Sequence, residues 1–289
     1  MRVSVRWLSY VWVIICIILP LALLLTISLT KTTWGVPPYT PLFQTLSSWS
    51  YGLNIHLQSY VFFLHYPLYQ HAIFNAFFMA LCTTAGCLIL GYPMAYGMAS
   101  ARCRLVWVSL AMIPFSTPFI LRIYAWVHLL SPEGVINNLL KVMGYQPCRL
   151  MGHKGAVVLG MVYGYLPFML IPLYTAFEKI SSSLIEASSD LGATRFQSFW
   201  RIVVPLSRTG AYSGSLMVFI TSLGEYVIPE LLGGHSTLTL GQVMWSEFFC
   251  QKDWPLACAM TISMIVCLWP LIWLFHKLQN PSVYDQGEL

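Results

Sequence analysis

The sequence is poor in charged residues. Asp, Glu, Lys and Arg make up only 9% of its 289 residues, whereas a soluble globular domain carries about 25%. Hydrophobic residues make up 57% of the chain, and the mean hydropathy is +0.69. This shortage of charge excludes an ordinary soluble domain and indicates an integral membrane protein.

Sequence motifs that bind nucleotides or metals, or that carry catalytic groups, are also absent. No phosphate-binding loop of the form G-x-x-x-x-G-K-[ST] occurs, so the chain cannot supply an ATP site itself. Neither H-E-x-x-H nor G-x-S-x-G is present. There is no C-x-x-C, and no His or Glu spacing fits a metal site. We therefore expect neither a catalytic residue nor a cofactor, which makes an intramembrane hydrolase a weak alternative.

Long hydrophobic segments are plentiful instead. A helix needs about 20 residues to cross about 30 Å of hydrocarbon, and six segments are that long. They lie at about 11–29, 72–101, 105–130, 155–177, 209–228 and 255–275. The first is too long for a signal peptide, and no small-residue cleavage site follows it before Lys31, so we expect it to be retained. The sequence predicts an all-α, polytopic membrane protein with six transmembrane helices in one domain, residues 1–289.

The distribution of Lys and Arg predicts the orientation of these spans. With six spans both termini lie on one side, and that side carries nine Lys and Arg residues against five on the other. The positive-inside rule then places both termini in the cytoplasm. The cluster of Lys141, Arg149 and Lys154 lies on the opposite side and runs against the rule.

Two extracytoplasmic loops follow from this orientation. Residues 31–71 form a long loop, which either caps the bundle and contacts an external partner or is poorly ordered. Residues 239–250 form an amphipathic run, which we expect to be an interfacial helix. Cys148 and Cys250 both fall on this side, and a disulfide between them stays open.

Residues 181–205, which we call the docking loop, contain the densest helical signals outside the spans. Ser183 and Glu186 match the capping box S-x-x-E, and Thr194 and Gln197 match a second capping box. Gly192, between them, suits the left-handed position that ends a helix. The loop therefore predicts a helix, a glycine turn and a second helix on the membrane surface.

The two helices of the docking loop each have a predicted apolar face. Pro205 is expected to end the second helix at the edge of the fifth span. We interpret the loop as a docking element, with an ordinary amphipathic surface loop as the alternative, because a channel or a protease would not need such a surface. The predicted apolar faces are Leu184, Ala187 or Ser188, and Leu191 in the first helix, and Phe196, Phe199, Trp200 and Val203 in the second.

Two residues that are charged at neutral pH fall inside predicted spans, Arg122 and Glu225. At 1.5 Å per residue both lie about 25 Å from the cytoplasmic face. A charge at mid-bilayer costs about 2.5–3.5 kcal/mol, so each should face protein or a wet cavity. They could pair, or Glu225 could meet a cationic substrate with help from nearby tyrosines. The candidates for the substrate path are Glu225, Tyr226, Arg122, Glu230 and Tyr163.

Small residues and prolines occur within the predicted spans. The fourth span contains Gly160 and Gly164, a G-x-x-x-G match, and the second contains Gly86 and Gly91. Small residues allow helices to approach closely in lipid. We expect a tightly packed bundle with broken helices, and the G-x-x-x-G match alone is weak evidence for a dimer face.

The docking loop also resembles a known family. Glu186-Ala187-Ser188, three residues, Gly192, nine residues, Ile202, one residue and Val204-Pro205 are similar to the EAA loop of ABC-importer permeases, E-A-A-x3-G-x9-I-x-L-P. Ser188 and Val204 depart from that pattern by small changes. In that family the loop is the coupling helix, seated in a groove of a cytoplasmic ATPase. The resemblance implies ATPase coupling through Glu186, Ala187, Ser188, Gly192, Ile202 and Pro205.

Resemblance to polyamine ABC permeases extends over nearly the whole chain. Gly91-Tyr92-Pro93 and residues 121–126 are similar to that group. Residues 224–234 and Asp253-Trp254-Pro255 resemble its putrescine-type more than its spermidine-type members. The resemblance implies a type I ABC-importer permease fold in the cell inner membrane. It implies a heterodimer with a second permease subunit, an ATPase dimer that binds the ATP, and a periplasmic polyamine-binding protein. Nucleic acid is not an expected partner, membrane lipid is, and an importer of another small cationic or amino-acid-like solute is the alternative.

Overall fold

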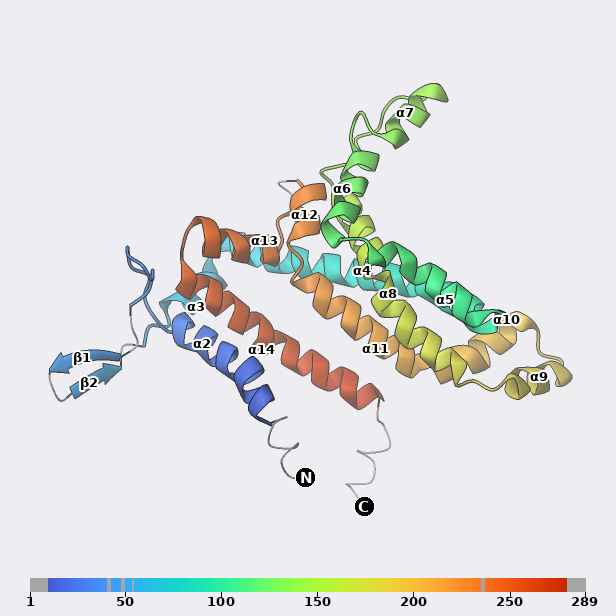
Figure 1. Ribbon diagram of the computed structural model, residues 1–289, viewed down its shortest axis with the longest axis horizontal. Helices are drawn as coiled ribbons and strands as arrows, with labels where there is room; N and C mark the ends of the chain where they lie inside the picture. Colours follow the sequence, from blue (N-terminus) through green and yellow to red (C-terminus); the bar gives the residue numbers. More distant parts are fainter. Residues whose placement is uncertain (1–9, 41–42, 48–49, 54, 235–236, 280–289) are drawn as a thin grey trace, which may run out of the picture. The chain divides into compact units, whose positions relative to one another are not determined.

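The computed structural model describes residues 10–40, 43–47, 50–53, 55–234 and 237–279 (Figure 1). Helices dominate this part of the chain, as predicted. The exception is a short antiparallel hairpin in the first long loop, formed by β1 (Phe43–Ser47) and β2 (Ser50–Leu53), with Thr45 opposite Tyr51. All eight cysteines are free thiols, including the exposed Cys148 and Cys250.

Five helices in the described ranges are long and apolar enough to cross a membrane. They are Tyr10–Ser28, Pro67–Ser100, Phe119–Val142, Lys154–Glu178 and Trp254–Phe275. Four of them correspond to the predicted first, second, fourth and sixth spans. The predicted fifth span is the 20-residue helix α11 (Val204–Leu223), which carries more polar residues. Two of these, Ser207 and Ser222, are buried and bond to carbonyls of their own helix.

The predicted third span is wrong as one continuous helix. Residues 104–130 instead form α5 (Arg104–Met112), the short 3₁₀-helix η2 (Ile113–Ser116) and α6 (Phe119–Leu130). The chain is extended at Thr117, with ψ 148°. The ring of Pro118 disfavours helical geometry at the residue before it and removes a backbone donor, which explains the break.

The helices form two compact units. The first consists of the chain up to Ile73 together with Gln242–Pro270, and the second of Phe74–Gly241 with the chain from Leu271 onward. Two long helices, α4 (Pro67–Ser100) and α14 (Trp254–Gln279), contribute to both units. Whether they act as the single domain predicted from the sequence stays a prediction.

In the first unit, α2 (Leu19–Ser28) follows the π-helical segment η1 (Ile14–Ile18), and α3 (Gln58–His65) precedes α4. A hydrogen bond of 2.7 Å between the hydroxyls of Ser28 and Tyr60 joins α2 to α3. Asp253 caps α14, because its Oδ1 accepts from Leu256 N at 3.1 Å. The predicted interfacial helix is confirmed as helical over α13 (Leu240–Trp245) and η5 (Ser246–Cys250).

The second unit is built around the packing of α8 against α11 (Figure 1). An ideal Cβ on Gly210 of α11 would lie 2.5 Å from the carbonyl oxygen of Pro172, and one on Gly214 would lie 2.8 Å from Met169 Sδ. Any side chain there would force the two helices apart. The remaining elements of this unit are α7 (Val135–Val142), α8 (Lys154–Glu178), α9 (Ser182–Asp190), α10 (Arg195–Ser198), the π-helical segment η3 (Phe199–Val203) and α12 (Val227–Leu232).

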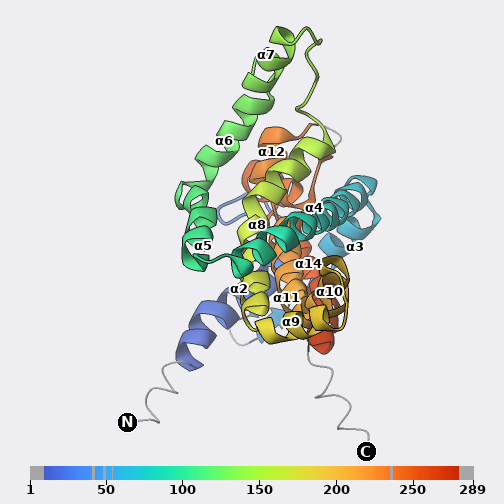
Figure 2. The same cartoon turned by 90° about the vertical axis from the view of Figure 1, so that its right-hand side faces the viewer.

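The predicted G-x-x-x-G match in α8 packs within the same chain. A Cβ on Gly160 would lie 2.6 Å from Leu232 Cδ1, and one on Gly164 would lie 3.6 Å from Ile228 Cδ1. The absence of side chains at these two glycines therefore allows α12 to pack closely against α8. Figure 2 shows α7 and α9 at opposite ends of α8.

Candidate functional site

The docking loop forms the predicted helix, glycine turn and helix (Figure 1). α9 ends at Asp190, and Gly192 adopts a φ of +81°, in the left-handed region. Gly192 N donates to the carbonyl of Ser189 at 2.9 Å, and Ala193 N donates to that of Ser188 at 3.0 Å. The turn thus satisfies the last carbonyls of α9 and reverses the chain into α10.

One of the two predicted capping boxes is present. Thr194 Oγ1 accepts from Gln197 N at 3.3 Å, and Gln197 Oε1 accepts from Thr194 N at 2.9 Å. The predicted box of Ser183 with Glu186 is wrong, because α9 begins at Ser182 and its N-cap residue makes no side-chain cap. Ser183 consequently lies inside the first turn, where its hydroxyl bonds to that of Ser181 at 2.9 Å.

Pro205 does not end the second helix, contrary to the prediction. α10, η3 and α11 follow one another without a break from Arg195 to Leu223. The π-helical turn routes Val204 N to the carbonyl of Phe199. Pro205, which lacks an N–H, then occupies the first turn of α11, where a missing donor costs little.

The outward face of the docking loop is apolar, and the predicted faces need correction. Leu184, Leu191, Phe196 and Trp200 are 47%, 90%, 72% and 55% exposed, so these four point outward and Ala187 is exposed with them. Ser188 and Val203 are buried, and Ile185 and Phe199 pack on the core of the unit. Large exposed apolar side chains on a polar loop are typical of a docking surface.

The residues matched to the family pattern divide between this surface and its support. Glu186, Ala187 and Pro205 are exposed and Ile202 is half-buried. Ser188, which replaces an Ala of the pattern, is 6% exposed, and its hydroxyl bonds to that of Ser198 at 2.7 Å. The departure from the pattern therefore adds a buried hydrogen bond between α9 and α10.

Glu225 is held by donors of its own chain. Its Oε1 accepts from Val227 N at 2.8 Å and from Ile228 N at 3.1 Å, the first backbone donors of α12. Its Oε2 accepts from the hydroxyl of Tyr165 on α8. A Cβ on Gly241 would lie 2.5 Å from the carbonyl oxygen of Glu225, so the chain is tightly packed here. The carboxylate therefore links the start of α12 to α8 through these hydrogen bonds.

Arg122 occupies a different environment from Glu225. Its guanidinium lies 4.9 Å from the ring centre of Phe115 and 5.6 Å from that of Phe119. Its Nε and Nη1 are buried, and neither has a hydrogen-bond partner among the described residues. Within that part of the chain no ion pair joins it to Glu225. Tyr163 packs on Phe115 at 6.0 Å, so it belongs to the aromatic cluster around Arg122.

The other two candidates for the substrate path lie on or beside α12. Tyr226 is half-buried and Glu230 is exposed. Their contact with a substrate stays a prediction.

One helix connects the docking loop to the Glu225 site. The helix from Arg195 to Leu223 begins at the docking loop and ends two residues before Glu225. At 1.5 Å per residue it spans roughly 40 Å. α8 runs beside it and carries Tyr165, the partner of Glu225. Gly210 and Gly214, which allow these two helices to pack closely, were not predicted from the sequence, although they have the same G-x-x-x-G spacing as Gly160 and Gly164 in α8.

Comparison with known proteins identifies one family, and the relatives described below are also transport-system permease proteins. Residues 87–280 match the family described as binding-protein-dependent transport system inner membrane component. The chain is 36% identical over 231 residues to the spermidine/putrescine transport system permease protein PotB of Haemophilus influenzae, covering 78% of this chain and 80% of that protein. It is 36% identical over 224 residues to PotB of Escherichia coli K12, covering 75% of this chain and 82% of that protein.

A solved structure has a similar fold. A chain in the crystal structure of a bacterial ABC transporter that imports the acidic polysaccharide alginate has a TM-score of 0.68 and 17% identity, covering 97% of this chain and 98% of that one. This agrees with the predicted type I importer fold. Since the relatives described above carry the PotB name, a closer similarity to the putrescine permease PotH stays a prediction.

Proposed function

The chain belongs to the family of binding-protein-dependent transport system inner membrane components, and from that premise we propose that it is the permease subunit of an ATP-driven polyamine importer. The family makes it a multi-pass inner-membrane transport subunit and not an enzyme. The observation that carries the substrate class is the 36% identity to permeases named for spermidine and putrescine. Putrescine is the favoured substrate and spermidine the second.

The proposed assembly pairs this chain with a second, different permease, a cytoplasmic ATPase dimer that binds the ATP, and a periplasmic polyamine-binding protein. The exposed apolar face of the docking loop supports ATPase contact, because a loop without a partner would gain nothing from exposing Leu191 and Phe196. The helix α10–η3–α11 is unbroken, so a displacement of the docking loop by the ATPase also displaces the end of this helix next to Glu225.

The proposed orientation places both termini and the docking loop in the cytoplasm. Within the second unit, Ser100 and Arg104, at the α4–α5 connection, line one pocket together with Glu178 and Ser182. The cations Arg102, Arg104, Lys179, Arg195 and Arg201 therefore lie on elements that meet at the docking-loop end. Lys141, Arg149 and Lys154 belong to the opposite end. This imbalance supports a cytoplasmic docking loop under the positive-inside rule.

The substrate path is proposed to run beside α12. Tyr226, Glu230, Tyr163 and Arg122 remain its candidate residues, and among them the carboxylate and the aromatic faces suit a dication. Glu225 acts as a positioning residue, because its carboxylate oxygens already accept three hydrogen bonds from this chain.

The substrate assignment is tested by uptake into proteoliposomes that contain the reconstituted complex. Labelled putrescine should be taken up with ATP, and unlabelled putrescine should compete more strongly than spermidine. Stronger competition by spermidine would contradict the putrescine assignment alone. Uptake of neither amine would contradict the polyamine class.

The coupling assignment is tested by charge reversal in α9. Glu186→Lys should lower uptake per ATP hydrolysed by more than about tenfold, since reversing a charge in a docked interface costs several kcal/mol. Asp190→Lys, an equally exposed carboxylate of the same helix, is the matched control. Equal effects of the two substitutions would contradict a specific role for Glu186.

A further inference from the structure

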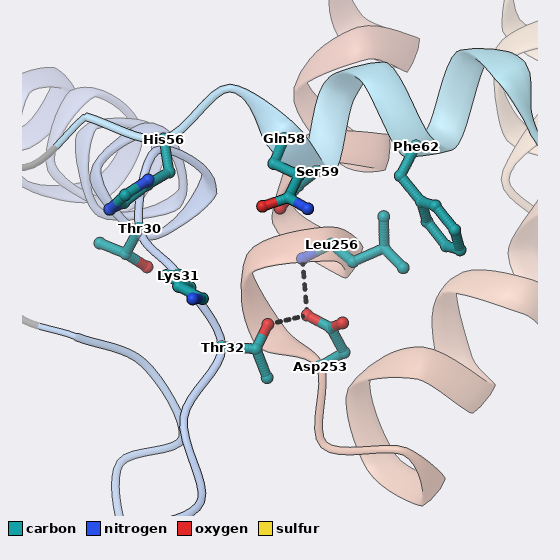
Figure 3. A pocket seen from close by; sticks show the side chains of 9 residues that line it. All are labelled: Thr30, Lys31, Thr32, His56, Gln58, Ser59, Phe62, Asp253 and Leu256. Atoms are coloured by element: carbon teal, nitrogen blue, oxygen red, sulfur yellow. Dashed lines mark hydrogen bonds between the residues drawn. The ribbon is translucent and has the colours of Figure 1, made fainter.

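The first unit contains a polar pocket of about 220 Å³ that the transport mechanism does not use (Figure 3). Three separate segments form it: the chain after α2, the chain that leads into α3, and the start of α14. Its lining consists of Thr30, Lys31, Thr32, His56, Gln58, Ser59, Phe62, Asp253 and Leu256.

Lys31 and Asp253, which carry opposite charges, both line this pocket but do not form an ion pair with each other. Lys31 forms no ion pair with Asp253 in the described part of the chain, and no side-chain partner of its Nζ occurs there. Asp253 Oδ1 accepts from Thr32 Oγ1 at 2.6 Å and from Leu256 N at 3.1 Å, as the dashed lines in Figure 3 mark. The second carboxylate oxygen has neither of these bonds. The pocket thus offers a cation and a fixed anion to one ligand.

The pocket lies next to the ends of two candidate spans. It adjoins the last residues of the candidate span Tyr10–Ser28 and the first residues of the candidate span Trp254–Phe275. The helices α2 and α3, which adjoin the pocket, both carry exposed apolar side chains. Leu23 and Leu25 of α2 are 54% and 48% exposed, and Val61 and Leu64 of α3 are each 56% exposed. A molecule with a charged head and hydrocarbon chains would satisfy the pocket and these surfaces together.

We propose that this pocket binds the headgroup of a zwitterionic aminophospholipid of the phosphatidylethanolamine type. Lys31, with His56 beside it, receives the phosphate, and the free oxygen of Asp253 receives the ammonium group. Gln58 and Ser59 supply further polar contacts, and the acyl chains lie along the exposed apolar residues of α2 and α3. The lipid thereby holds the ends of two spans and α3 together.

Lipid is favoured over other occupants by the same observations. A polyamine has no anionic group for Lys31, so the pocket is a poor site for the proposed substrate. A docked protein would not need exposed apolar side chains such as Val61 and Leu64 on a helix that adjoins the charged groups. An acidic lipid without an amine would leave Asp253 without its counter-charge.

The test uses the full chain in its purified complex, delipidated in detergent and studied by native mass spectrometry. Phosphatidylethanolamine, phosphatidylglycerol and phosphatidylcholine are added separately at equal concentration. Phosphatidylethanolamine should be retained about tenfold more strongly than the other two, since only it presents both a phosphate and an ammonium that donates hydrogen bonds. Equal retention of the three lipids would overturn the proposal.

Variants locate the binding to the pocket. Lys31→Gln should lower phosphatidylethanolamine retention about tenfold, whereas Lys141→Gln, an exposed lysine on α7, should leave it unchanged. Asp253→Asn should abolish the preference for phosphatidylethanolamine over phosphatidylglycerol, with thermal unfolding measured because Asp253 also caps α14. Wild-type retention in Lys31→Gln would overturn the proposal.

Two further measurements distinguish a bound lipid from a free zwitterion and from a docked protein. Soluble phosphoethanolamine should compete only weakly, because it lacks acyl chains. Competition as strong as that of the lipid would assign the pocket to a free zwitterion and overturn the lipid. Unchanged lipid retention in Lys31→Gln with a loss of binding-protein-stimulated ATPase activity would assign the pocket to protein docking and equally overturn it.

Discussion

At the scale of single residues, Glu225 shows how an ionisable group in a predicted span can serve the chain itself. A carboxylate that caps α12 and accepts from Tyr165 is solvated by protein, which offsets the cost of placing it in the span. We expect these contacts to weaken its attraction for a cation, because its charge is already shared among three donors.

Replacing Glu225 should affect stability before it affects substrate affinity. Glu225→Ala leaves the N–H groups of Val227 and Ile228 unpaired, and we expect it to destabilise the protein by about 2 kcal/mol. Glu225→Gln keeps one acceptor oxygen and should keep the KM for putrescine within about threefold of wild type, which is less than 1.4 kcal/mol in binding. Thermal unfolding and uptake kinetics measure the two effects. Glu133→Ala, at an exposed carboxylate, is the control, and a large rise in KM for Glu225→Gln would place Glu225 on the substrate path.

The hydroxyl of Ser188 is a second case in which one side-chain group is expected to contribute to stability. Ser188→Ala restores the family residue but removes the buried bond to Ser198, and should destabilise the protein by about 1 kcal/mol. Ser189→Ala removes only an exposed bond within α9 and should change stability little. The comparison is made by thermal unfolding of the purified complex. Equal shifts for the two variants would remove the inter-helix bond from the explanation.

At the scale of elements, the effect of the glycine turn on coupling can be distinguished from the effect of backbone strain on stability by comparing Gly192 with Gly144. Gly192 and Gly144 both have positive φ, +81° and +84°, and both have open space around an ideal Cβ. A β-branched residue should cost about 1–2 kcal/mol at either position. Gly192→Val should in addition uncouple ATP hydrolysis from uptake, while Gly144→Val should not. Assays of both activities on the two variants decide this, and normal coupling in Gly192→Val would contradict the role of the turn.

The contact between α8 and α11 should be sensitive to an added side chain. In Gly210→Val the new Cβ would meet the carbonyl of Pro172, which is backbone and cannot move aside. We expect a loss of at least about 2 kcal/mol and of both ATPase activity and uptake. Gly97→Val, at a position where a Cβ meets nothing within 4 Å, is the control. Membrane expression and thermal unfolding report the difference, and equal behaviour of the two variants would refute it.

At the scale of the whole molecule, the orientation across the membrane can be read from two exposed thiols. Cys103 joins α4 to α5, and Cys148 joins α7 to α8. In variants that retain only one of them, a membrane-impermeant thiol reagent should label Cys148 in intact spheroplasts and Cys103 only after permeabilisation. The reverse pattern would place the docking loop outside the cell and would remove its contact with an ATPase.

The sequence by itself determined the class of the protein, most of its spans, the glycine turn and the second capping box. These depend on composition and on residues a few positions apart, where local geometry decides the outcome. It did not determine which side of α9 and α10 is buried, because Leu184 and Leu191 satisfy the helical period equally well whether they face the core or a partner.

Only the tertiary structure decided the contacts of Glu225 and Arg122 and the place of Pro205 in its helix. The partners of Glu225 include Tyr165, 60 positions away, and no local pattern encodes such a contact. Pro205 lies within a continuous helix because a π-turn rearranges the hydrogen bonds before it. Long-range packing therefore fixed the link between the docking loop and the Glu225 site, since that link depends on the close approach of Gly210 and Gly214 in α11 to Pro172 and Met169 in α8.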